Sequence, residues 1–147
     1  MKKLVVLGGG ESGIGAALLA KNNNYDVFVS DKGTISDKEV LINNGIKWEE
    51  GSHTMEEILT ATEVVKSPGI PDTIPLVRKL ISEGIPVISE VEFAYRYTNA
   101  KIIAITGSNG KTTTTLLVGH ILKNAGFDVL VAGNIGTGFA KSISERD

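Results

Sequence analysis

The chain has 147 residues, of which 41% are apolar and 22% charged, with a net charge of −2 and no cysteine. These values are typical of a soluble chain of one domain, or one and a fraction, and the lack of cysteine excludes disulfides and thiolate metal sites. Lysine and arginine are scattered rather than gathered in a basic stripe, which argues against a nucleic-acid partner. The apolar run at residues 4–7 is too short for a signal peptide, and no run approaches the roughly 18 apolar residues of a membrane span. We therefore expect a cytoplasmic protein with no membrane partner.

The chain opens with the pattern of a nucleotide-binding βαβ unit. The pattern predicts a strand over 3–7, a helix over 14–21 and a second strand over 25–30 that ends in Asp31. Between the first strand and the helix, Gly8, Gly10 and Gly13 have the G-x-G-x-x-G spacing of a dinucleotide loop, to which an acidic residue after the second strand also belongs. A glycine-rich turn that binds nothing has the same appearance. Glu11 lies inside this loop, where a carboxylate repels a phosphate unless its side chain turns away.

Strands and helices continue to alternate up to residue 97. The expected elements are a helix over 36–44 closed by Gly45, strands over 46–48, 63–66 and 86–88, and a helix over 74–83 followed by Gly84. Two capping boxes, Thr54 with Glu57 and Ser89 with Glu92, predict the starts of two more helices, the second running to Tyr97. Five strands, each followed by a helix, predict an α/β fold: a Rossmann-like five-stranded parallel sheet domain over residues 1–97 with right-handed crossovers.

Two further features of this domain lie at strand ends. The loop Ser67–Pro71 follows a buried strand, at the edge of the sheet where ligands bind in open α/β folds. A simple proline–glycine turn is an equally good interpretation of it. Glu90 and Glu92 lie in the first turn of the last helix, where carboxylates more often stabilise the helix dipole than act as an acid and a base.

A polar joint at residues 98–101 precedes a second unit, which we assign to residues 98–147 and interpret as the start of a phosphate-loop α/β ATPase domain. Its central feature is the run TGSNGKTTT at Thr106–Thr114, between a strand-like run at 102–105 and a helix-like run at 112–124. Strand, glycine loop and helix in this order predict a phosphate-binding loop, although its first glycine, Gly107, makes it shorter than the usual pattern. Lys111 is expected to reach the β- and γ-phosphates, and the hydroxyl of Thr112 to face a magnesium ion.

The second unit offers too few strands for a complete domain. After the phosphate-loop helix, which ends at Gly126, a strand is expected over 128–132 and a helix over 139–145, with Gly133–Gly136 between them. Two strands cannot form the core of a domain of about 100 to 150 residues. Either the chain is a truncated part of a longer enzyme, or the second unit packs against the first domain or a second chain. An exposed sheet edge would favour self-association.

Together these motifs resemble the amino-terminal third of the Mur ligase family, the ATP-dependent enzymes that add amino acids in peptidoglycan synthesis. The phosphate loop is similar to that of the whole family and of its folylpolyglutamate synthetase relatives. Ser67-Pro68-Gly69-Ile70 and Glu90-Val91-Glu92-Phe93 resemble the branch that adds D-glutamate. Gly8–Gly13 and Gly133-Asn134-Ile135-Gly136 complete the resemblance, which covers essentially all of this chain. Members of the family are much longer and have three domains.

The resemblance implies a role for individual residues. The implied substrate-binding residues are Ser12 and Gly13 at the diphosphate, Asp31 and Lys32 at the uracil, Gly69 beside the sugar, and Asn134 from the second unit. The implied ATP-phosphate residues are Gly107, Ser108, Asn109, Gly110, Lys111, Thr112 and Thr113, with Lys111 as the catalytic cation and Thr112 as the magnesium ligand. Glu11 and Gly33 depart from the family's pattern.

The resemblance also implies the reaction. ATP with Mg²⁺ would activate the alanyl carboxylate of UDP-N-acetylmuramoyl-L-alanine as an acyl phosphate, which the amine of D-glutamate attacks, and Lys111 would draw off charge. In the family, the remaining magnesium ligands and the domain that holds D-glutamate lie beyond this stretch, so we expect this chain alone to be inactive. His53, expected in a solvated loop, and His120, expected to be partly packed in a helix, do not replace them, because nothing near either has ligand spacing.

Three other interpretations stay open at this point. The chain could be a nucleotide-binding module only, holding a UDP-muramoyl substrate. It could be an NAD-dependent oxidoreductase domain, on the strength of Gly8, Gly10, Gly13 and Asp31, which leaves the phosphate loop unexplained. It could be a small kinase, which leaves the first domain unexplained. The response to UDP-sugar, NAD and ATP separates them.

Overall fold

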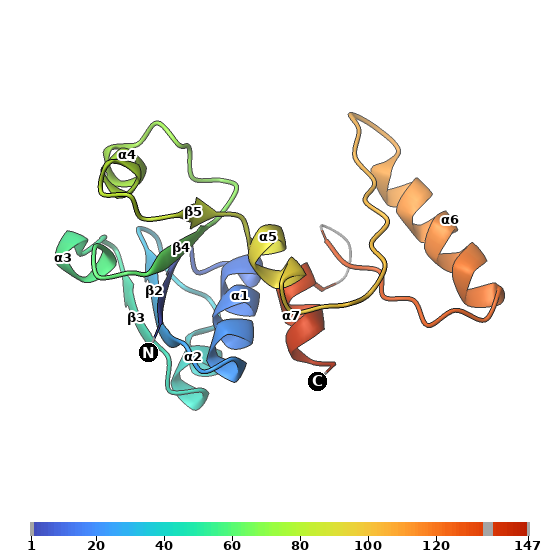
Figure 1. Ribbon diagram of the computed structural model, residues 1–147, viewed down its shortest axis with the longest axis horizontal. Coiled ribbons are helices and arrows are strands. Elements are labelled where there is room, and N and C mark those ends of the chain that lie inside the picture. Colours follow the sequence, from blue (N-terminus) through green and yellow to red (C-terminus); the bar gives the residue numbers. More distant parts are fainter. Residues whose placement is uncertain (1, 134–136, 147) are drawn as a thin grey trace.

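A computed structural model describes residues 2–133 and 137–146 of the chain (Figure 1). Its centre is one sheet of five parallel strands in the order β3-β2-β1-β4-β5. The strands are β1 (Lys3–Leu7), β2 (Asp26–Asp31), β3 (Lys47–Glu50), β4 (Glu63–Lys66) and β5 (Val87–Ile88). This order confirms the predicted Rossmann-like sheet, and it places the point where the direction of winding reverses between β1 and β4.

The helices of the described residues cover both faces of this sheet, except for α6 (Lys111–Asn124), which stands apart from it. The others are α1 (Glu11–Asn22), α2 (Lys38–Asn43), α3 (Met55–Ile58), α4 (Pro75–Ser82), α5 (Glu90–Tyr95) and α7 (Phe139–Ser144). Successive residues of β1 point to opposite faces: Leu4 and Val6 pack in a core with α1, α2, α5 and α7, whereas Val5 and Leu7 pack in a second core with α3 and α4. Phe93 of α5 is fully buried in the first core and contacts Tyr25 edge to face.

The two predicted capping boxes have different outcomes. At α5 the hydroxyl of Ser89 accepts a hydrogen bond from the backbone N–H of Glu92 at 3.1 Å, as expected of a cap. At α3 the helix begins where the box predicts, with Thr54 at the N-cap position, but the Thr54 side chain caps no backbone N–H. Its hydroxyl instead donates to Glu49 at 2.5 Å, and Glu57 pairs with Lys3 on β1. Neighbouring charged groups on the sheet therefore compete successfully for both members of this box.

The second unit contains helices but no strands among its described residues. α6 forms as predicted, whereas residues 102–105 and 128–132 belong to no strand, so both strand predictions are wrong. A strand needs a neighbour to bond its N–H and C=O groups, and neither segment pairs with the five-stranded sheet. Residues 128–132 instead lie along α6, where a Cβ on Gly119 would come within 2.6 Å of Val131.

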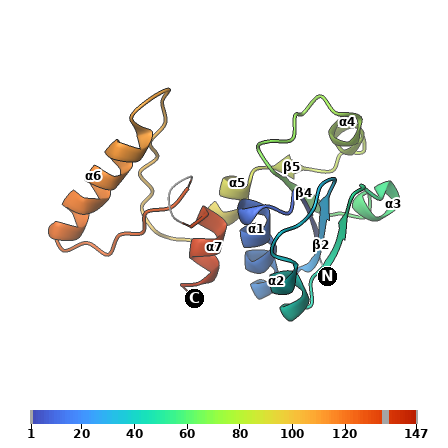
Figure 2. The same cartoon turned by 180° about the vertical axis from the view of Figure 1, so that it is seen from behind.

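The two helices of the second unit are placed differently. α6 and the segments beside it stand away from the sheet in both views (Figures 1 and 2), and Leu116, Leu117 and Ile121 of α6 are exposed. α7 lies against α1 and α5, and its Ala140 and Ile143 are buried in the first core. The last helix of the second unit is therefore part of the packing around the first sheet.

Candidate functional site

Three of the glycines in the loop after β1, Gly8, Gly9 and Gly13, are packed too closely to carry a side chain. Gly8 has a φ of +104°, and a Cβ on Gly13 would lie 1.9 Å from the carbonyl oxygen of Gly8. A Cβ on Gly9 would lie 2.5 Å from Ile35. α1 therefore begins directly at the end of the strand, with the N–H groups of its first turn facing the carboxyl edge of the sheet.

Asp31 connects this loop to the end of β2. One of its carboxylate oxygens accepts a hydrogen bond from the N–H of Gly9 at 2.5 Å, and the other accepts from the N–H of Gly33 at 2.7 Å. Charge-assisted bonds of this kind fix both the loop and the turn after β2. The acidic residue that the sequence marked for ligand contact thus holds the shape of the site as well.

Lys66, at the end of β4, is a functional candidate that the sequence patterns did not single out. Its ammonium group donates to the carbonyl oxygen of Ile70 at 2.5 Å and pairs with Asp72 at 3.1 Å. The side chain is only 15% exposed, so its charge is partly desolvated, and Asp72 offsets part of that charge. The only signal in the sequence is a lysine at the end of an otherwise apolar strand.

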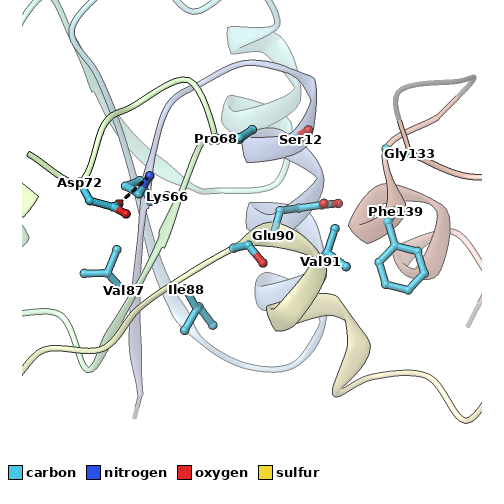
Figure 3. A pocket seen from close by; sticks show the side chains of 12 residues that line it. Ser12, Lys66, Pro68, Asp72, Val87, Ile88, Glu90, Val91, Gly133 and Phe139 are labelled. Atoms are coloured by element: carbon cyan, nitrogen blue, oxygen red, sulfur yellow. Dashed lines mark ion pairs between the residues drawn. The ribbon is translucent and has the colours of Figure 1, made fainter. Parts of the chain in front are cut away.

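Two cavities open at the carboxyl edge of the sheet, at the reversal point between β1 and β4. The larger has a volume of about 630 Å³ and is lined by the loops after β1, β2, β3 and β4, including Gly8, Asp31, Lys32, His53 and Gly69. The smaller, of about 400 Å³, is lined by residues that include Ser12, Lys66, Pro68, Glu90, Gly133 and Phe139 (Figure 3). This is the place where ligands bind in open parallel sheets.

His53 is not the freely solvated loop residue that the sequence suggested. It is half-buried at the wall of the larger cavity, with Nδ1 2.6 Å from the hydroxyl oxygen of Ser30. Because that hydroxyl donates its one proton to Glu49 at 2.7 Å, Nδ1 of His53 must be the donor in the contact. Burial opposes the effect, but hydrogen bonds from Thr54 and Ser30 hold the pKa of Glu49 below its ordinary value.

Two carboxylates face the start of α7 beside the smaller cavity. Glu11 turns away from the glycine loop, and its Oε1 accepts from the N–H of Gly138 at 3.2 Å. This removes the conflict with a phosphate that its position suggested. Oε1 of Glu90 accepts from the N–H of Ala140 at 2.5 Å, and burial raises the pKa of the Glu90 carboxyl while that N–H opposes the shift. Glu90 therefore does more than stabilise the dipole of its own helix.

The phosphate loop has the expected backbone but lies apart from both cavities. Gly107 and Gly110 have φ values of +152° and +75°, and α6 begins directly after them. Such a loop exposes backbone N–H groups to which only glycine gives access, which fits a bound polyphosphate. Lys111 bends back to the carbonyl oxygen of Gly107 at 2.5 Å, and residues 106–114 are exposed.

The structure brings together some of the site residues predicted from the sequence. Asp31, Lys32 and Gly69 share the larger cavity, and Ser12 lines the smaller one. Gly13 is buried beneath the loop. Neither cavity is lined by a residue of 107–113. Asn134 lies outside the described residues. The ligand roles assigned to all of them stay predictions.

The described residues contain neither a metal-binding cluster nor a membrane-spanning helix. Between residues 2 and 146, leaving out 134–136, no group of three or more His, Cys, Asp or Glu side chains is placed to hold a metal ion. His120 is exposed and bonds only to Asn124 at 2.8 Å, so the expectation that it is partly packed is wrong. In the same part of the chain, no helix has the length and apolar character needed to cross a bilayer.

Comparison with known proteins gives a consistent result along the chain. Residues 2–89 match the family model of the MurD-like N-terminal domain of Mur ligases, and residues 105–146 match that of the Mur ligase middle domain. The UDP-N-acetylmuramoylalanine–D-glutamate ligases of Bacteroides fragilis and Christiangramia forsetii are 60% and 56% identical to the chain over 99% of its length. The chain spans 33% of the length of these relatives.

Solved structures of the same family also resemble this chain. A murein peptide ligase from Psychrobacter arcticus matches 90% of the chain and 28% of its own, with a TM-score of 0.60 and 26% identity. The UDP-N-acetylmuramate–alanine ligase MurC from Thermotoga maritima matches 85% of the chain and 30% of its own, with a TM-score of 0.58 and 28% identity. With a MurD-like N-terminal domain over residues 2–89, built on the predicted Rossmann-like sheet, the chain belongs to the Mur ligase family.

Proposed function

We propose that this chain is the substrate-binding part of an ATP-dependent ligase that adds D-glutamate to UDP-N-acetylmuramoyl-L-alanine in peptidoglycan synthesis. One observation carries the proposal: two adjoining cavities open at the reversal point of the sheet, lined by the glycine loop after β1 and the Ser67–Pro71 loop after β4. Similarity to the D-glutamate ligases along nearly the whole chain supports the choice of substrate. An enzyme of this kind acts in the cytoplasm, where ATP is available.

We assign the two cavities to the two ends of the nucleotide. The larger cavity takes the uridine, beside Asp31, Lys32 and Gly69. The smaller cavity lies at the first turn of α1, where the N–H groups near Ser12 and Gly13 meet the diphosphate. Lys66 borders the same cavity and supplies a partly desolvated positive charge there.

The phosphate loop is assigned to ATP. Gly107, Ser108, Asn109, Gly110 and Thr113 offer backbone N–H groups, Lys111 its ammonium group and Thr112 its hydroxyl toward magnesium. When bound, ATP with Mg²⁺ supplies the phosphoryl group that activates a carboxylate. Lys111 must first leave the carbonyl oxygen of Gly107, to which it is bonded here. Because the chain spans 33% of its relatives' length, we expect it to bind ligands without completing the reaction.

Binding of NAD is the alternative that the glycine spacing would allow. Both carboxylate oxygens of Asp31 already accept N–H groups, from Gly9 and Gly33. These bonds fix the carboxylate in the loop, and the similarity of nearly the whole chain to D-glutamate ligases favours the muramoyl nucleotide over NAD. We therefore expect the UDP-muramoyl nucleotide, and not NAD, to occupy the glycine loop.

Thermal unfolding tests the proposal directly. The chain is heated alone, with UDP, with UDP-N-acetylmuramoyl-L-alanine, with NAD and with ATP and magnesium, because a ligand of the folded state raises the melting temperature. We expect the muramoyl nucleotide to raise it and NAD to leave it unchanged. Lys32→Ala should reduce the shift, whereas Lys47→Ala, at the exposed start of β3, should not. A shift with NAD alone would contradict the proposal in favour of an oxidoreductase domain.

A further inference from the structure

The short helix α7 is held by side chains from an earlier part of the chain. Its first turn has no side-chain cap of its own, since Gly138 is at the N-cap position. Glu11 from the start of α1 bonds the N–H of Gly138 at 3.2 Å, and Glu90 from α5 bonds the N–H of Ala140 at 2.5 Å. Two carboxylates from two other elements thus satisfy N–H groups that the end of a helix leaves unpaired.

Burial makes the Glu90 contact specific. The residue is only 8% exposed, and a carboxylate out of water is costly unless charged or polar partners surround it. Glu92 occupies the same first turn of α5, but its carboxylate is largely exposed and lies 3.9 Å from Arg96. The two neighbours on one helix therefore have different environments, and only Glu90 faces α7.

Gly15 lets α7 approach the backbone of α1. A Cβ at this position would lie 2.8 Å from the backbone nitrogen of Lys141 and 2.9 Å from its Cβ. Ala140 and Ile143 of α7 are buried in the core that α1 covers, and Asn22 at the far end of α1 donates to the carbonyl oxygen of Ser144 at 3.3 Å. The contact between the two helices is thus close along the whole length of α7.

The held end of α7 also forms a wall of the smaller cavity. Gly133, Gly138 and Phe139 line that cavity together with Ser12 and Glu90 (Figure 3). An added Cβ on Gly138 would lie 3.8 Å from Cα of Ser12. A displacement of α7 away from α1 would therefore open the cavity at the side opposite the loop after β4.

We propose that Glu90 and Glu11 are positioning residues for the smaller cavity: by fixing the first turn of α7 against α1, they hold in place the wall that Gly138 and Phe139 contribute. The inference rests on the proposed function for the ligand that the cavity receives. The same contact holds together the two ends of the segment that carries the phosphate loop. The chain leaves α5 at Tyr95 and returns to it at Gly138.

The test compares Glu90→Ala, Glu11→Ala and Glu92→Ala in the 147-residue chain. Hydrogen exchange of the Ala140 and Ser142 amides reports on α7, and calorimetric titration with UDP-N-acetylmuramoyl-L-alanine reports on the cavity. Glu90→Ala should speed exchange in α7 and weaken binding on the order of tenfold, since it leaves a buried N–H unpaired. Glu11→Ala should have a smaller effect in the same direction, and Glu92→Ala none.

A second pair of variants separates positioning from general loss of structure. Glu90→Gln keeps an oxygen acceptor for the Ala140 N–H and should restore binding and protection to near the wild-type values. Gly15→Ala leaves both carboxylates in place but displaces α7, and should weaken binding as Glu90→Ala does. Exchange elsewhere in the sheet should be unchanged in every variant that is folded.

The outcomes distinguish this inference from the proposed function. Faster exchange in α7 of Glu90→Ala with unchanged nucleotide affinity would overturn the positioning role, and so would an equal loss of affinity in Glu92→Ala. If Glu90→Ala does not fold, Glu11→Ala and Gly15→Ala decide by the same two measurements. A wild-type chain that protects α7 but binds no muramoyl nucleotide would overturn the proposed function and the cavity role with it.

Discussion

The glycines of the loop after β1 differ in whether a side chain can be accommodated at their position. Gly13 faces the carbonyl oxygen of Gly8 at a distance that no Cβ can occupy, whereas nothing lies within 4 Å of the Cβ position of Gly10. The G-x-G-x-x-G spacing predicts this loop, but it does not tell which glycine meets the backbone. The need for glycine at position 13 follows from the close contact of α1 with the carbonyl oxygen of Gly8.

We expect Gly13→Ala to destabilise the chain by about 3 kcal/mol, because α1 must move away from the strand to admit a methyl group. In an ordinary helix interior, replacing Gly by Ala stabilises the fold by about 1 kcal/mol. A destabilising effect of Gly13→Ala would therefore by itself indicate the close contact with Gly8. Urea denaturation of the variant measures it. Gly10→Ala is the matched control and should change the free energy of unfolding by less than about 1 kcal/mol.

Glu90 should make stability depend on pH. Burial raises the pKa of its carboxyl in the folded state above the ordinary 4.5, so the folded chain holds this proton more tightly than the unfolded chain. The stability that this tighter proton binding contributes is fully present below the pKa that Glu90 has in the unfolded chain. It is lost as the pH rises through the pKa that Glu90 has in the folded chain. Glu90→Gln does not titrate and lacks this loss.

The measurement is the free energy of unfolding of wild type and Glu90→Gln at about pH 4 and about pH 7. We expect the wild type to lose stability relative to the variant as the pH rises. Lys66 and Asp72 in the same cavity and Glu11 at the same helix end are present in both proteins, so the difference between them isolates Glu90. A difference that stays constant with pH, or grows in favour of the wild type, would contradict the prediction.

Among the elements, those of the first domain form where sequence periodicity predicts them, because each finds a partner. β1 is paired on both sides and buried on both faces, and Ser89 caps α5 as its capping box predicts. Residues 102–105 are as apolar as β1 but have no neighbouring strand, and they form none. Periodicity therefore predicts what a segment can form, and pairing decides whether it does.

The helix α5 allows a matched test of burial. Phe93→Ala should destabilise the chain by about 3–5 kcal/mol, because its fully buried ring packs between Tyr25 and Tyr97 in the first core. Tyr95→Ala, two residues along and 61% exposed, should change stability by less than about 0.5 kcal/mol. Chemical denaturation measures both. Equal effects would mean that α5 does not pack as described.

The candidate site was predictable to the extent that it depends on strand ends. Carboxyl ends of parallel strands share one edge, so Asp31, Lys32 and Gly69 meet in one cavity as their positions in the sequence imply. The contact of Glu90 with Ala140 joins residues fifty positions apart through one backbone N–H, which leaves no periodic signal. The sequence patterns did not identify Lys66 and His53, because the importance of both side chains depends on the groups that surround them in the folded chain.

On the scale of the whole molecule, the segment 102–130 exposes an apolar surface that includes Ile103, Leu117, Ile121 and Phe127. A surface of this kind favours association in water. We expect the 147-residue chain to self-associate as its concentration rises, and sedimentation velocity measures this. The double variant Leu117→Lys with Ile121→Lys should be monomeric over a wider range of concentration.

Ile42→Lys is the matched control for this association, because Ile42 is 61% exposed on α2, away from α6. It adds the same type of charge and should leave the association unchanged. Association that responds equally to both substitutions would reflect net charge rather than the surface of α6. A chain that stays monomeric at every concentration would contradict the prediction.

The packing of α7 on α1 has a consequence for how the chain folds as it is made. The surface of α1 that Ala140 and Ile143 cover is synthesised more than a hundred residues before these two residues. It therefore stays exposed while the ribosome synthesises the segment with the phosphate loop. The sheet can form early from neighbouring strands, but its first core closes only when α7 has emerged. Ribosome pausing between residues 98 and 138 would prolong the time for which nascent chains expose this apolar face to chaperones and to one another.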